Sequence, residues 1–424
     1  MKILIRKGII VDRNSSYHLK KMDVLVENGY IVEINENNIG VSGIDKIYEA
    51  SNLHISIGWF DFSVHYKDPG TEWQESLDSF QKAAEKGGYT EIVGFPNTLP
   101  IVQTKESLAY FRDFSEKNIV KLHNFGAVTK ACEGKDFTDM IDLHYNGAVG
   151  FSDGKYPIQS SDILLKTLQY LHPINAILIN KSEDKYLGLF GQIHEGLEST
   201  KLGLKGIPSA AEEIMILRDL KLLEYTGLKS ELPILHFSTI SSAESVNLIR
   251  KAKKKGLPVS CDIAAHNLAF TEKDMRTFNT NFKVKPPFRS ENDVLALKEG
   301  LKDGTIDLIV SDHNALDSEQ KNLEFDLAEF GAIGLETTFS VINMYSDLNI
   351  EQIITLLTEN PRKILRMEIP SIKVGERANL TLFDPSLSYV FEEKGIVSKS
   401  KNSPFIGEKL TGKALGIIHN SLNS

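Results

Sequence analysis

Cysteine is scarce in this chain, and its scarcity limits both the compartment and the chemistry. The 424 residues include only two cysteines, Cys132 and Cys261, which form no Cys-x-x-Cys pair. A disulfide scaffold and a thiolate zinc site are therefore not expected. The charged stretch Met1 to Lys7 lacks the apolar segment and cleavage signal of a secretory leader. These features predict a cytoplasmic protein.

Long apolar runs and blocks of like charge are also missing. No apolar run approaches the ~20 residues that cross a bilayer. The longest run of one charge is the three lysines at 253–255, and the net charge is −9. We therefore expect no binding to nucleic acid or to an anionic membrane. A hydrophobic content of 41% and a charged content of 25% are typical of a globular protein.

Both ends of the chain show the period-two alternation of β-strands. The segments that carry it are residues 2–11, 23–34, 378–383 and 415–419. Because these segments flank a long middle region, we predict one small β-sandwich assembled from both termini. Its predicted parts are residues 1–53 and 366–424, and residues 54–365 form the other domain.

The middle region alternates short apolar runs with amphipathic stretches, the pattern of parallel βαβ units. Two helices are predicted, over 72–86 and 211–225, with apolar stripes at Leu77, Phe80, Ala83 and Ala84 and at Ile214, Leu217, Leu220 and Leu223. Eight such units predict a TIM (β/α)8 barrel. A doubly wound sheet is the alternative, but no glycine-rich dinucleotide turn follows the first strand. The eight predicted strands are 54–62, 91–95, 122–128, 148–151, 176–179, 233–237, 258–263 and 306–310.

Polar side chains cluster where the predicted barrel strands end. Barrel active sites lie at this carboxyl-terminal face, so the clustering predicts a site there. Individually, each residue also has a structural interpretation: His236 as a hydrogen-bonded core histidine, Asp153 as a turn residue, Asp312 as a cap. The residues concerned are His65, Asn97, Asp153, Asn180, His236, His266 and Asp312.

Several motifs resemble those of the dihydroorotases of the amidohydrolase superfamily, over nearly the whole chain. The resemblance is to the bacterial type, in which an aspartate bridges the metals. It implies interconversion of N-carbamoyl-aspartate and dihydroorotate in pyrimidine biosynthesis, at one or two zinc ions with a bridging hydroxide. The motifs are Phe-Pro-Asn-Thr (95–98), Gly-Phe-Ser-Asp (150–153), His-Glu-Gly (194–196), His-Phe-Ser-Thr (236–239), Lys-Val-Lys-Pro-Pro (283–287), Ser-Asp-His (311–313), Gly-Leu-Glu-Thr (334–337) and Asn-Ser-Pro-Phe (402–405).

The resemblance also assigns roles to single residues. It implies metal ligands at His65, Asp153, His236 and Asp312, with Asp312 as the catalytic proton shuttle. The family's other two histidine ligands are replaced, by Ser63 and Asn180. A hydroxyl and an amide are poor zinc ligands beside imidazole and carboxylate. We therefore expect one zinc ion at most, or none.

The substrate contacts implied by the resemblance have changed as well. Asn97 is retained, but Lys67 replaces an arginine that forks onto the substrate carboxylate, and Lys285 replaces an asparagine. A lysine keeps the charge and loses the bidentate geometry. Leu316 stands where the family has a second histidine. We also hypothesise that the Lys285 ammonium replaces the charge of the metal and pairs with Asp153 or Asp312.

Three functions remain open on this evidence. The first is a pseudoenzyme that acts as a structural partner of aspartate carbamoyltransferase, as do some homologues with missing metal histidines. The second is an active dihydroorotase, or a related cyclic-amide hydrolase, that uses a single zinc. The third is a small-molecule binding or regulatory protein that uses the old pocket. In each case we expect a homo-oligomer.

Overall fold

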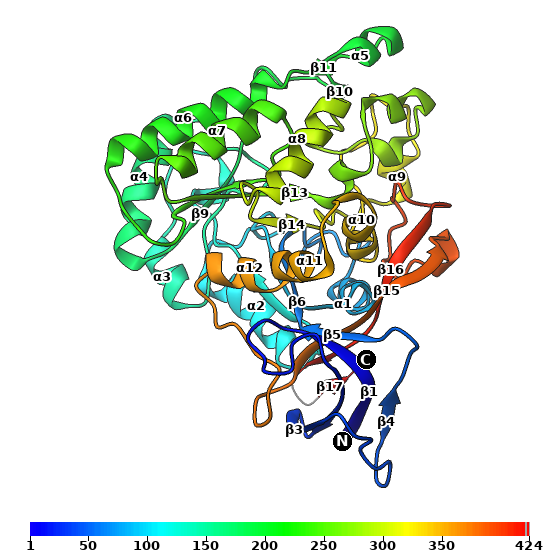
Figure 1. Ribbon diagram of the computed structural model, residues 1–424. Coiled ribbons are helices and arrows are strands. Elements are labelled where there is room, and N and C mark those ends of the chain that lie inside the picture. The colour runs from blue at the N-terminus through cyan, green and yellow to red at the C-terminus, as the bar shows by residue number, and fades with distance from the viewer. Residues whose placement is uncertain (420–421, 424) are drawn as a thin grey trace.

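Both termini contribute to one small β domain, as predicted. The structure, a computed structural model, describes residues 1–419 and 422–423. In Figure 1 the first and last strands, β1 and β17, lie together in this domain, beside the larger one. Its hydrogen-bonded strand order is β17-β16-β15-β5-β1-β2-β3, with β4 paired to β1. The strands are β1 (Lys2–Val11), β2 (Lys21–Glu27), β3 (Tyr30–Asn35), β4 (Lys46–Tyr48), β5 (His54–Ile57), β15 (Asn379–Val390), β16 (Lys409–His419) and β17 (Leu422–Asn423).

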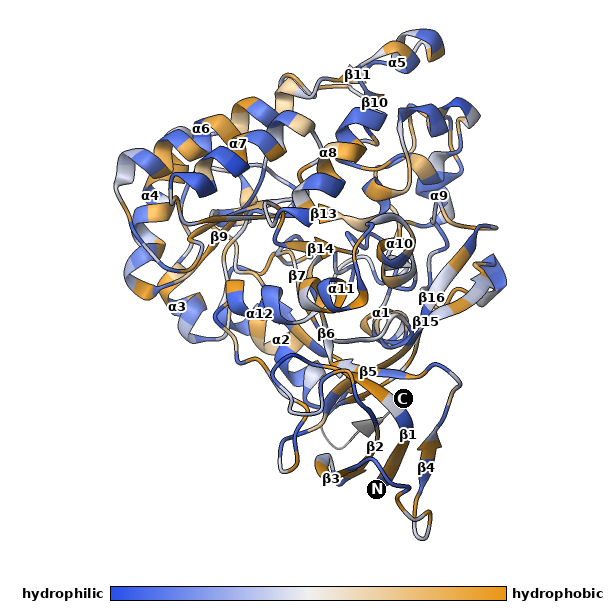
Figure 2. Ribbon diagram, viewed as in Figure 1, coloured by the Kyte–Doolittle hydropathy of each residue, from blue (hydrophilic) through white to orange (hydrophobic). Residues whose placement is uncertain are grey.

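The core of this β domain joins residues that are far apart in sequence. Ile5 and Val24 from the first strands pack in one buried cluster with Leu380 and Ile418 from the last. Figure 2 shows this as a concentration of hydrophobic colour along the terminal strands. Neither terminal segment can bury its apolar face alone, so the two depend on each other.

The predicted strand 54–62 is divided between the two domains. Its first part, β5, pairs with β1 and β15 in the terminal sheet, whereas β6 begins the barrel at Trp59. Gly58 lies between them. This position requires a glycine, because a Cβ there would collide with the side chains of Asn379 and Thr90. The change of sheet therefore falls after Ile57.

The barrel consists of parallel strands in sequential order, as predicted for a (β/α)8 fold. One sheet has the order β6-β7-β8 and the other β14-β13-β12-β9. Between them, Phe151 forms single bridges to Gly126 and Leu178, where a strand over 148–151 was expected. The ring closes where the His65 N–H donates to the His313 carbonyl, 2.9 Å away. The barrel strands are β6 (Trp59–Val64), β7 (Tyr89–Gly94), β8 (Lys121–Asn124), β9 (Leu178–Lys181), β12 (Leu235–Ser238), β13 (Val259–Ala264) and β14 (Leu308–Val310).

Helices cover the outside of the barrel (Figure 1). None of the described helices is long and apolar enough to cross a membrane. The helices are α1 (Leu77–Gly87), α2 (Lys105–Ser115), α3 (Met140–Tyr145), α4 (Ser161–Leu171), α6 (Ala210–Thr226), α7 (Ala243–Lys254), α8 (Glu291–Lys302), α10 (Thr338–Tyr345), α11 (Ile350–Leu357) and α12 (Glu359–Ile364). Excursions at the carboxyl-terminal face add β10 (Ile193–His194), α5 (Leu197–Leu202), β11 (Gly206–Ile207) and α9 (Ser318–Lys321). Short 3-10 turns lie at Lys130–Cys132, His172–Ile174, Ala265–Leu268, Glu272–Thr277, Thr280–Phe282 and Glu393–Gly395.

The two predicted apolar stripes have different outcomes. All four stripe residues of α1 are buried, which confirms that prediction. In α6 the stripe is half wrong. Leu220 and Leu223 are buried, but Ile214 and Leu217 are 50% and 48% exposed. Met215 and Ile216 are buried instead, because the face that meets α4 and α7 is rotated from the predicted one.

A buried ion pair fastens α12 to the barrel and to the β domain. Arg362 is fully buried and donates to Glu91 Oε1 in β7 over 2.9 Å, while its guanidinium lies over the Phe60 ring. Glu91 also accepts from Asn379 of β15 at 3.0 Å and contacts His123 of β8 at 3.0 Å. Burial alone would raise the pKa of Glu91, but Arg362 and His123 hold it well below its usual value.

We predict that Arg362→Met destabilises the protein by ~3–5 kcal/mol, since it leaves the Glu91 carboxylate buried without its cation. Urea unfolding followed by circular dichroism measures this. The double variant Arg362→Met with Glu91→Gln should be more stable than Arg362→Met alone, because the uncompensated charge is gone. A double variant that is no more stable would contradict the electrostatic explanation.

Candidate functional site

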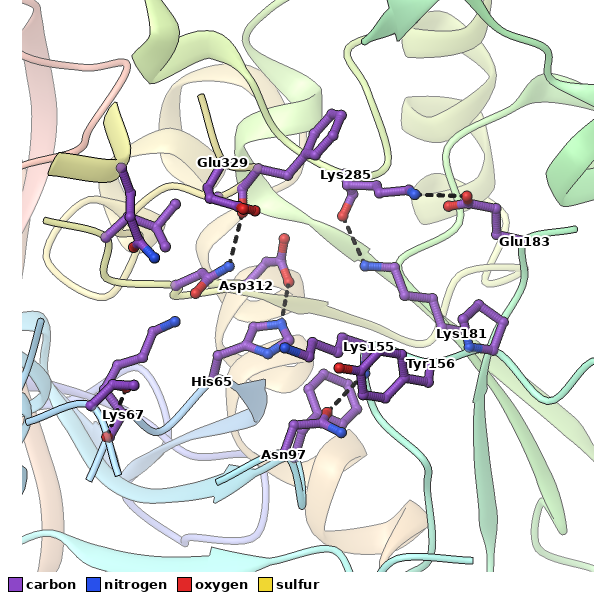
Figure 3. A pocket seen from close by; sticks show the side chains of 18 of the residues that line it. His65, Lys67, Asn97, Lys155, Tyr156, Lys181, Glu183, Lys285, Asp312 and Glu329 are labelled. Carbon is purple, nitrogen blue, oxygen red and sulfur yellow. Dashed lines mark hydrogen bonds and ion pairs between the residues drawn. The ribbon is translucent and has the colours of Figure 1, made fainter. Parts of the chain in front are cut away.

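A cavity of about 880 Å³ opens at the carboxyl-terminal face of the barrel. The sequence predicted a site at this face. Figure 3 shows side chains from several strand ends and loops converging on the cavity. Its charged lining consists of His65, Lys67, Lys155, Lys181, Glu183, Lys185, Lys285, Asp312 and Glu329.

His65 and Asp312 are the two predicted metal ligands that the structure brings together in this cavity. His65 Nε2 lies 3.7 Å from Asp312 Oδ1. Burial lowers the pKa of His65, and the Asp312 carboxylate opposes that shift. Burial would raise the pKa of Asp312, but His65 and the charge of Lys181 hold it below its usual value. Asp312 has φ +47°, an unusual conformation for a residue with a side chain.

Asp153, the predicted bridging ligand, is turned away from the cavity. Its Oδ1 accepts from the N–H groups of Val128 and Thr129 at 3.0 and 2.9 Å, and its Oδ2 accepts from the Thr129 hydroxyl. Asn97 fixes the same loop, since its Nδ2 donates to the Asp153 carbonyl and its Oδ1 accepts from the Lys155 N–H. Both residues therefore hold a loop in place.

His236 is a core residue one layer below the cavity. In the register of β12 with β9, His236 pairs with Ile179, whereas Ser238 pairs with Lys181. Its imidazole is fully buried, packs on Phe62, and has partners at 2.8 Å on both nitrogens. These partners are the Ser260 hydroxyl and the Asp262 carboxylate. The structural interpretation of His236 therefore fits its surroundings.

Asn180 faces the outside of the barrel, and its neighbour Lys181 faces the cavity. Asn180 Nδ2 donates to Asp219 of α6 at 2.7 Å, and its Oδ1 accepts from the Ile158 N–H. Lys181 Nζ lines the cavity and donates to the Lys285 carbonyl at 2.8 Å. The side chain that β9 presents to His65 and Asp312 is thus an ammonium group.

The predicted pairing of Lys285 with Asp153 or Asp312 is wrong. Lys285 forms an ion pair with Glu183 at 2.8 Å, at the cavity rim. Lys181 is the cation whose charge acts on Asp312. The positive charge near Asp312 therefore comes from Lys181 and not from Lys285.

Lys67 extends into the cavity, as expected for a residue at the family's arginine position. Burial, reinforced by the charge of Lys155, lowers its pKa to about 8. Leu316 also lines the cavity, as an apolar wall. Ser63 does not reach it; its hydroxyl is buried without a hydrogen-bond partner among the described residues.

The donor set does not fit a zinc site. Catalytic zinc takes three protein ligands plus water. Within residues 1–419 and 422–423, no group of three His, Cys, Asp or Glu side chains is arranged to hold a metal ion. His65 and Asp312 supply two donors, and the nearby Lys181 ammonium is a competing cation. A second imidazole, that of His266, also lies within the electrostatic influence of Asp312. Its Nε2 is buried without a hydrogen-bond partner among these residues.

Lys155, Lys181, Glu183 and Glu329 were not identified from the sequence as cavity residues. For Lys181 a signal existed. Ile177 and Ile179 lie in the interior cluster of the barrel, and side chains alternate along a strand. Lys181 is the next residue of that parity, and Asn180 is not. Lys155 and Glu329 lie on loops, which have no such periodicity.

Two buried lysines hold the loop that forms one wall of the cavity. Lys321 Nζ donates to the carbonyls of Lys283, Glu329 and Gly331 at 3.4, 2.9 and 3.1 Å. Lys283 Nζ donates to the carbonyls of Phe325 and Asp326. Burial and the charge of Lys283 lower the pKa of Lys321 to about 7.

Comparison with known proteins shows the family of this chain. The family described as Dihydro-orotase-like matches residues 54–245, and the Amidohydrolase family matches residues 190–415. The dihydroorotase of Acetivibrio thermocellus is 38% identical over 415 residues, covering 97% of this chain and 96% of that protein. The dihydroorotase of Pelotomaculum thermopropionicum is 35% identical over 418 residues, with 97% and 96% covered.

Solved structures share the fold at lower identity. The L-hydantoinase (dihydropyrimidinase) of Arthrobacter aurescens superimposes with a TM-score of 0.82 at 22% identity, covering 99% of this chain and 95% of that one. The dihydropyrimidinase of Brevibacillus agri gives 0.81 at 19% identity, with 100% and 95% covered. These likenesses support the barrel and β-sandwich architecture.

We predict that Lys181→His raises zinc retention and that Asn180→His does not. Asn180→His loses the buried bond to Asp219, lowers stability by ~1–3 kcal/mol, and leaves zinc retention unchanged. Lys181→His removes the ammonium, places an imidazole beside His65 and Asp312, and raises zinc retention. Elemental analysis after dialysis against zinc measures both. Higher zinc in Asn180→His than in Lys181→His would contradict the assigned orientations.

We predict that Lys321→Met destabilises the protein by about 2 kcal/mol or more, since buried carbonyls lose their donor. The pKa of Lys321, about 7, lies below its usual 10.5. Between these values the unfolded chain binds a proton that the folded chain does not, so this group makes unfolding free energy rise with pH. The deficit of the variant should therefore grow from about pH 7 toward pH 10.

Urea unfolding at several pH values tests this prediction. Lys254→Met is the matched control, because Lys254 is exposed on α7. The control should change stability by less than ~0.5 kcal/mol. If the loss of unfolding free energy in Lys321→Met becomes smaller as pH rises, the prediction that this lysine has a lowered pKa in the folded protein is wrong.

Proposed function

This chain belongs to the dihydroorotase family of amidohydrolases. From that premise we propose that it is a homologue of the pyrimidine-biosynthesis enzyme, and that its own barrel no longer carries out metal-dependent ring opening. Its proposed role is that of a structural partner of aspartate carbamoyltransferase. We further propose that it is cytoplasmic and forms a homo-oligomer. The family membership supports the pathway, and the residues at the barrel mouth support the loss of activity.

The observation that carries the proposal is the Lys181 ammonium beside His65 and Asp312. Bound zinc would supply positive charge, lower the pKa of a water and polarise the scissile carbonyl. Lys181 can supply only the positive charge. It satisfies the Asp312 carboxylate electrostatically and disfavours a divalent cation at the same place.

The substrate side of the cavity supports the same conclusion. Lys67 offers a point charge in place of a guanidinium fork, and Lys285 is engaged with Glu183. Both polar atoms of the Asn97 side chain already bind the 153–155 loop. Each contact for a substrate carboxylate is therefore weakened or occupied.

An exposed apolar face on α6 supports a role in assembly. Ile214, Leu217 and Tyr225 are 50%, 48% and 77% exposed. Their spacing of three and eight residues puts them on one side of the helix. Apolar groups gathered on one exposed face are typical of surfaces that bind another protein.

The second candidate function is a dihydroorotase, or a related cyclic-amide hydrolase, that uses one zinc. The unpartnered Nε2 of His266 favours it, because His266 together with His65 and Asp312 would make three donors. In that case Asp312 would have to serve as both ligand and proton shuttle.

One experiment separates the two candidates. We predict that the purified protein retains less than stoichiometric zinc, shows no dihydroorotate hydrolysis when zinc is added, and co-purifies with aspartate carbamoyltransferase from its own cells. Stoichiometric zinc with turnover that Asp312→Asn abolishes would overturn the proposal and establish the one-zinc enzyme. Metal-free, inactive protein that does not bind the carbamoyltransferase would refute the proposed partnership and leave the proposed loss of activity standing.

A further inference from the structure

The cavity carries an excess of positive charge in a protein that is acidic overall. Five lysines line it against three carboxylates, whereas the whole chain has a net charge of −9. Lys285 is neutralised by Glu183. In the part of the chain that the structure describes, Lys67, Lys155 and Lys181 form no ion pair with a carboxylate. Lys181 lies near Asp312, so Lys67, Lys155 and Lys185 are the lining lysines without a carboxylate in ion-pair contact among the described residues.

Lys67 and Lys155 are held in place by the protein. Lys67 follows β6 and is half-buried among the cavity residues Phe95 and Leu316. The backbone of Lys155 is fixed, because its N–H donates to Asn97 Oδ1 at 2.8 Å, while its Nζ lies 5.1 Å from the centre of the Tyr156 ring. Figure 3 shows both side chains reaching into the cavity around His65. Lys67 is half-buried and Lys155 is exposed at the cavity mouth. Two like charges that line one cavity attract an anion.

We propose that this cavity binds a small organic phosphate, with the phosphate group between the ammonium groups of Lys67 and Lys155. A phosphate monoester carries close to two negative charges at neutral pH on one compact group, so it neutralises both lysines together. None of the described residues that line the cavity is an arginine, and lysines bind phosphate as point charges. This phosphate site differs from the substrate-carboxylate contact that the family resemblance assigns to Asn97, because Asn97 Oδ1 here accepts from the Lys155 N–H.

The rest of the cavity indicates the nature of the ligand's body. A volume of about 880 Å³ is far more than inorganic phosphate needs, and it lies within the usual range for small organic ligands. Tyr156 and Phe190 line the cavity and are 48% and 73% exposed. These aromatic faces suit a planar or apolar group attached to the phosphate.

The test is calorimetric titration of the full-length protein with phenyl phosphate, inorganic phosphate and succinate. We expect phenyl phosphate to bind more tightly than inorganic phosphate, and succinate to bind most weakly. Lys67→Met and Lys155→Met should each weaken phenyl phosphate binding roughly tenfold or more, since each removes one of two adjacent charges. Lys254→Met changes the net charge by the same amount on an exposed helix and should leave binding unchanged.

Several outcomes would overturn the proposal: no binding of phenyl phosphate, tighter binding of succinate, or equal weakening by Lys254→Met. Circular dichroism confirms that each variant is folded. If Lys67→Met does not fold, Lys67→Arg retains the charge and should keep binding, while Lys155→Met still tests the site. The titration uses the chain alone, so its result is separate from zinc content and from binding to the carbamoyltransferase.

Discussion

The alternation of side chains along the barrel strands is the constraint on which this site depends. Ile177, just before β9, and Ile179 within it fill the barrel interior, so Lys181 projects into the cavity and Asn180 projects outward to Asp219. The register with β12 then places His236 beside Ile179, one layer below the cavity. These placements keep Asn180 and His236 out of the cavity and put the Lys181 ammonium in it.

The charge of Lys181 acts on the Asp312 carboxylate at the barrel mouth. An ammonium and a zinc ion both stabilise a buried carboxylate such as Asp312, but only the metal has open coordination positions for water and substrate. With Lys181 in place, His65 and Asp312 remain close and charge-compensated. Under our proposal, the fold keeps its pocket while the chemistry of the pocket becomes that of lysines that bind an anion.

The scaffold beneath the cavity is held together by contacts that have little to do with catalysis. Arg362, Glu91 and Asn379 join an outer helix, a barrel strand and the terminal sheet around one buried ion pair. Asp153 and His236, whose residue types suggest metal chemistry, are also satisfied by hydrogen bonds within the scaffold. A family motif can therefore persist because it supports packing.

The sequence by itself determined the fold class, the α1 stripe and the family, because periodicity and local motifs carry that information. It also located the cavity, through His65, Lys67, Asn97 and Asp312 at strand ends. The parity of the strand already favoured Lys181 over Asn180 as the cavity residue. Only the tertiary structure decided that His236 lies beneath the site and that Lys285 pairs with Glu183. Those facts depend on the register between strands and on how loops close over the barrel, and neither is encoded in the spacing of residues along the chain.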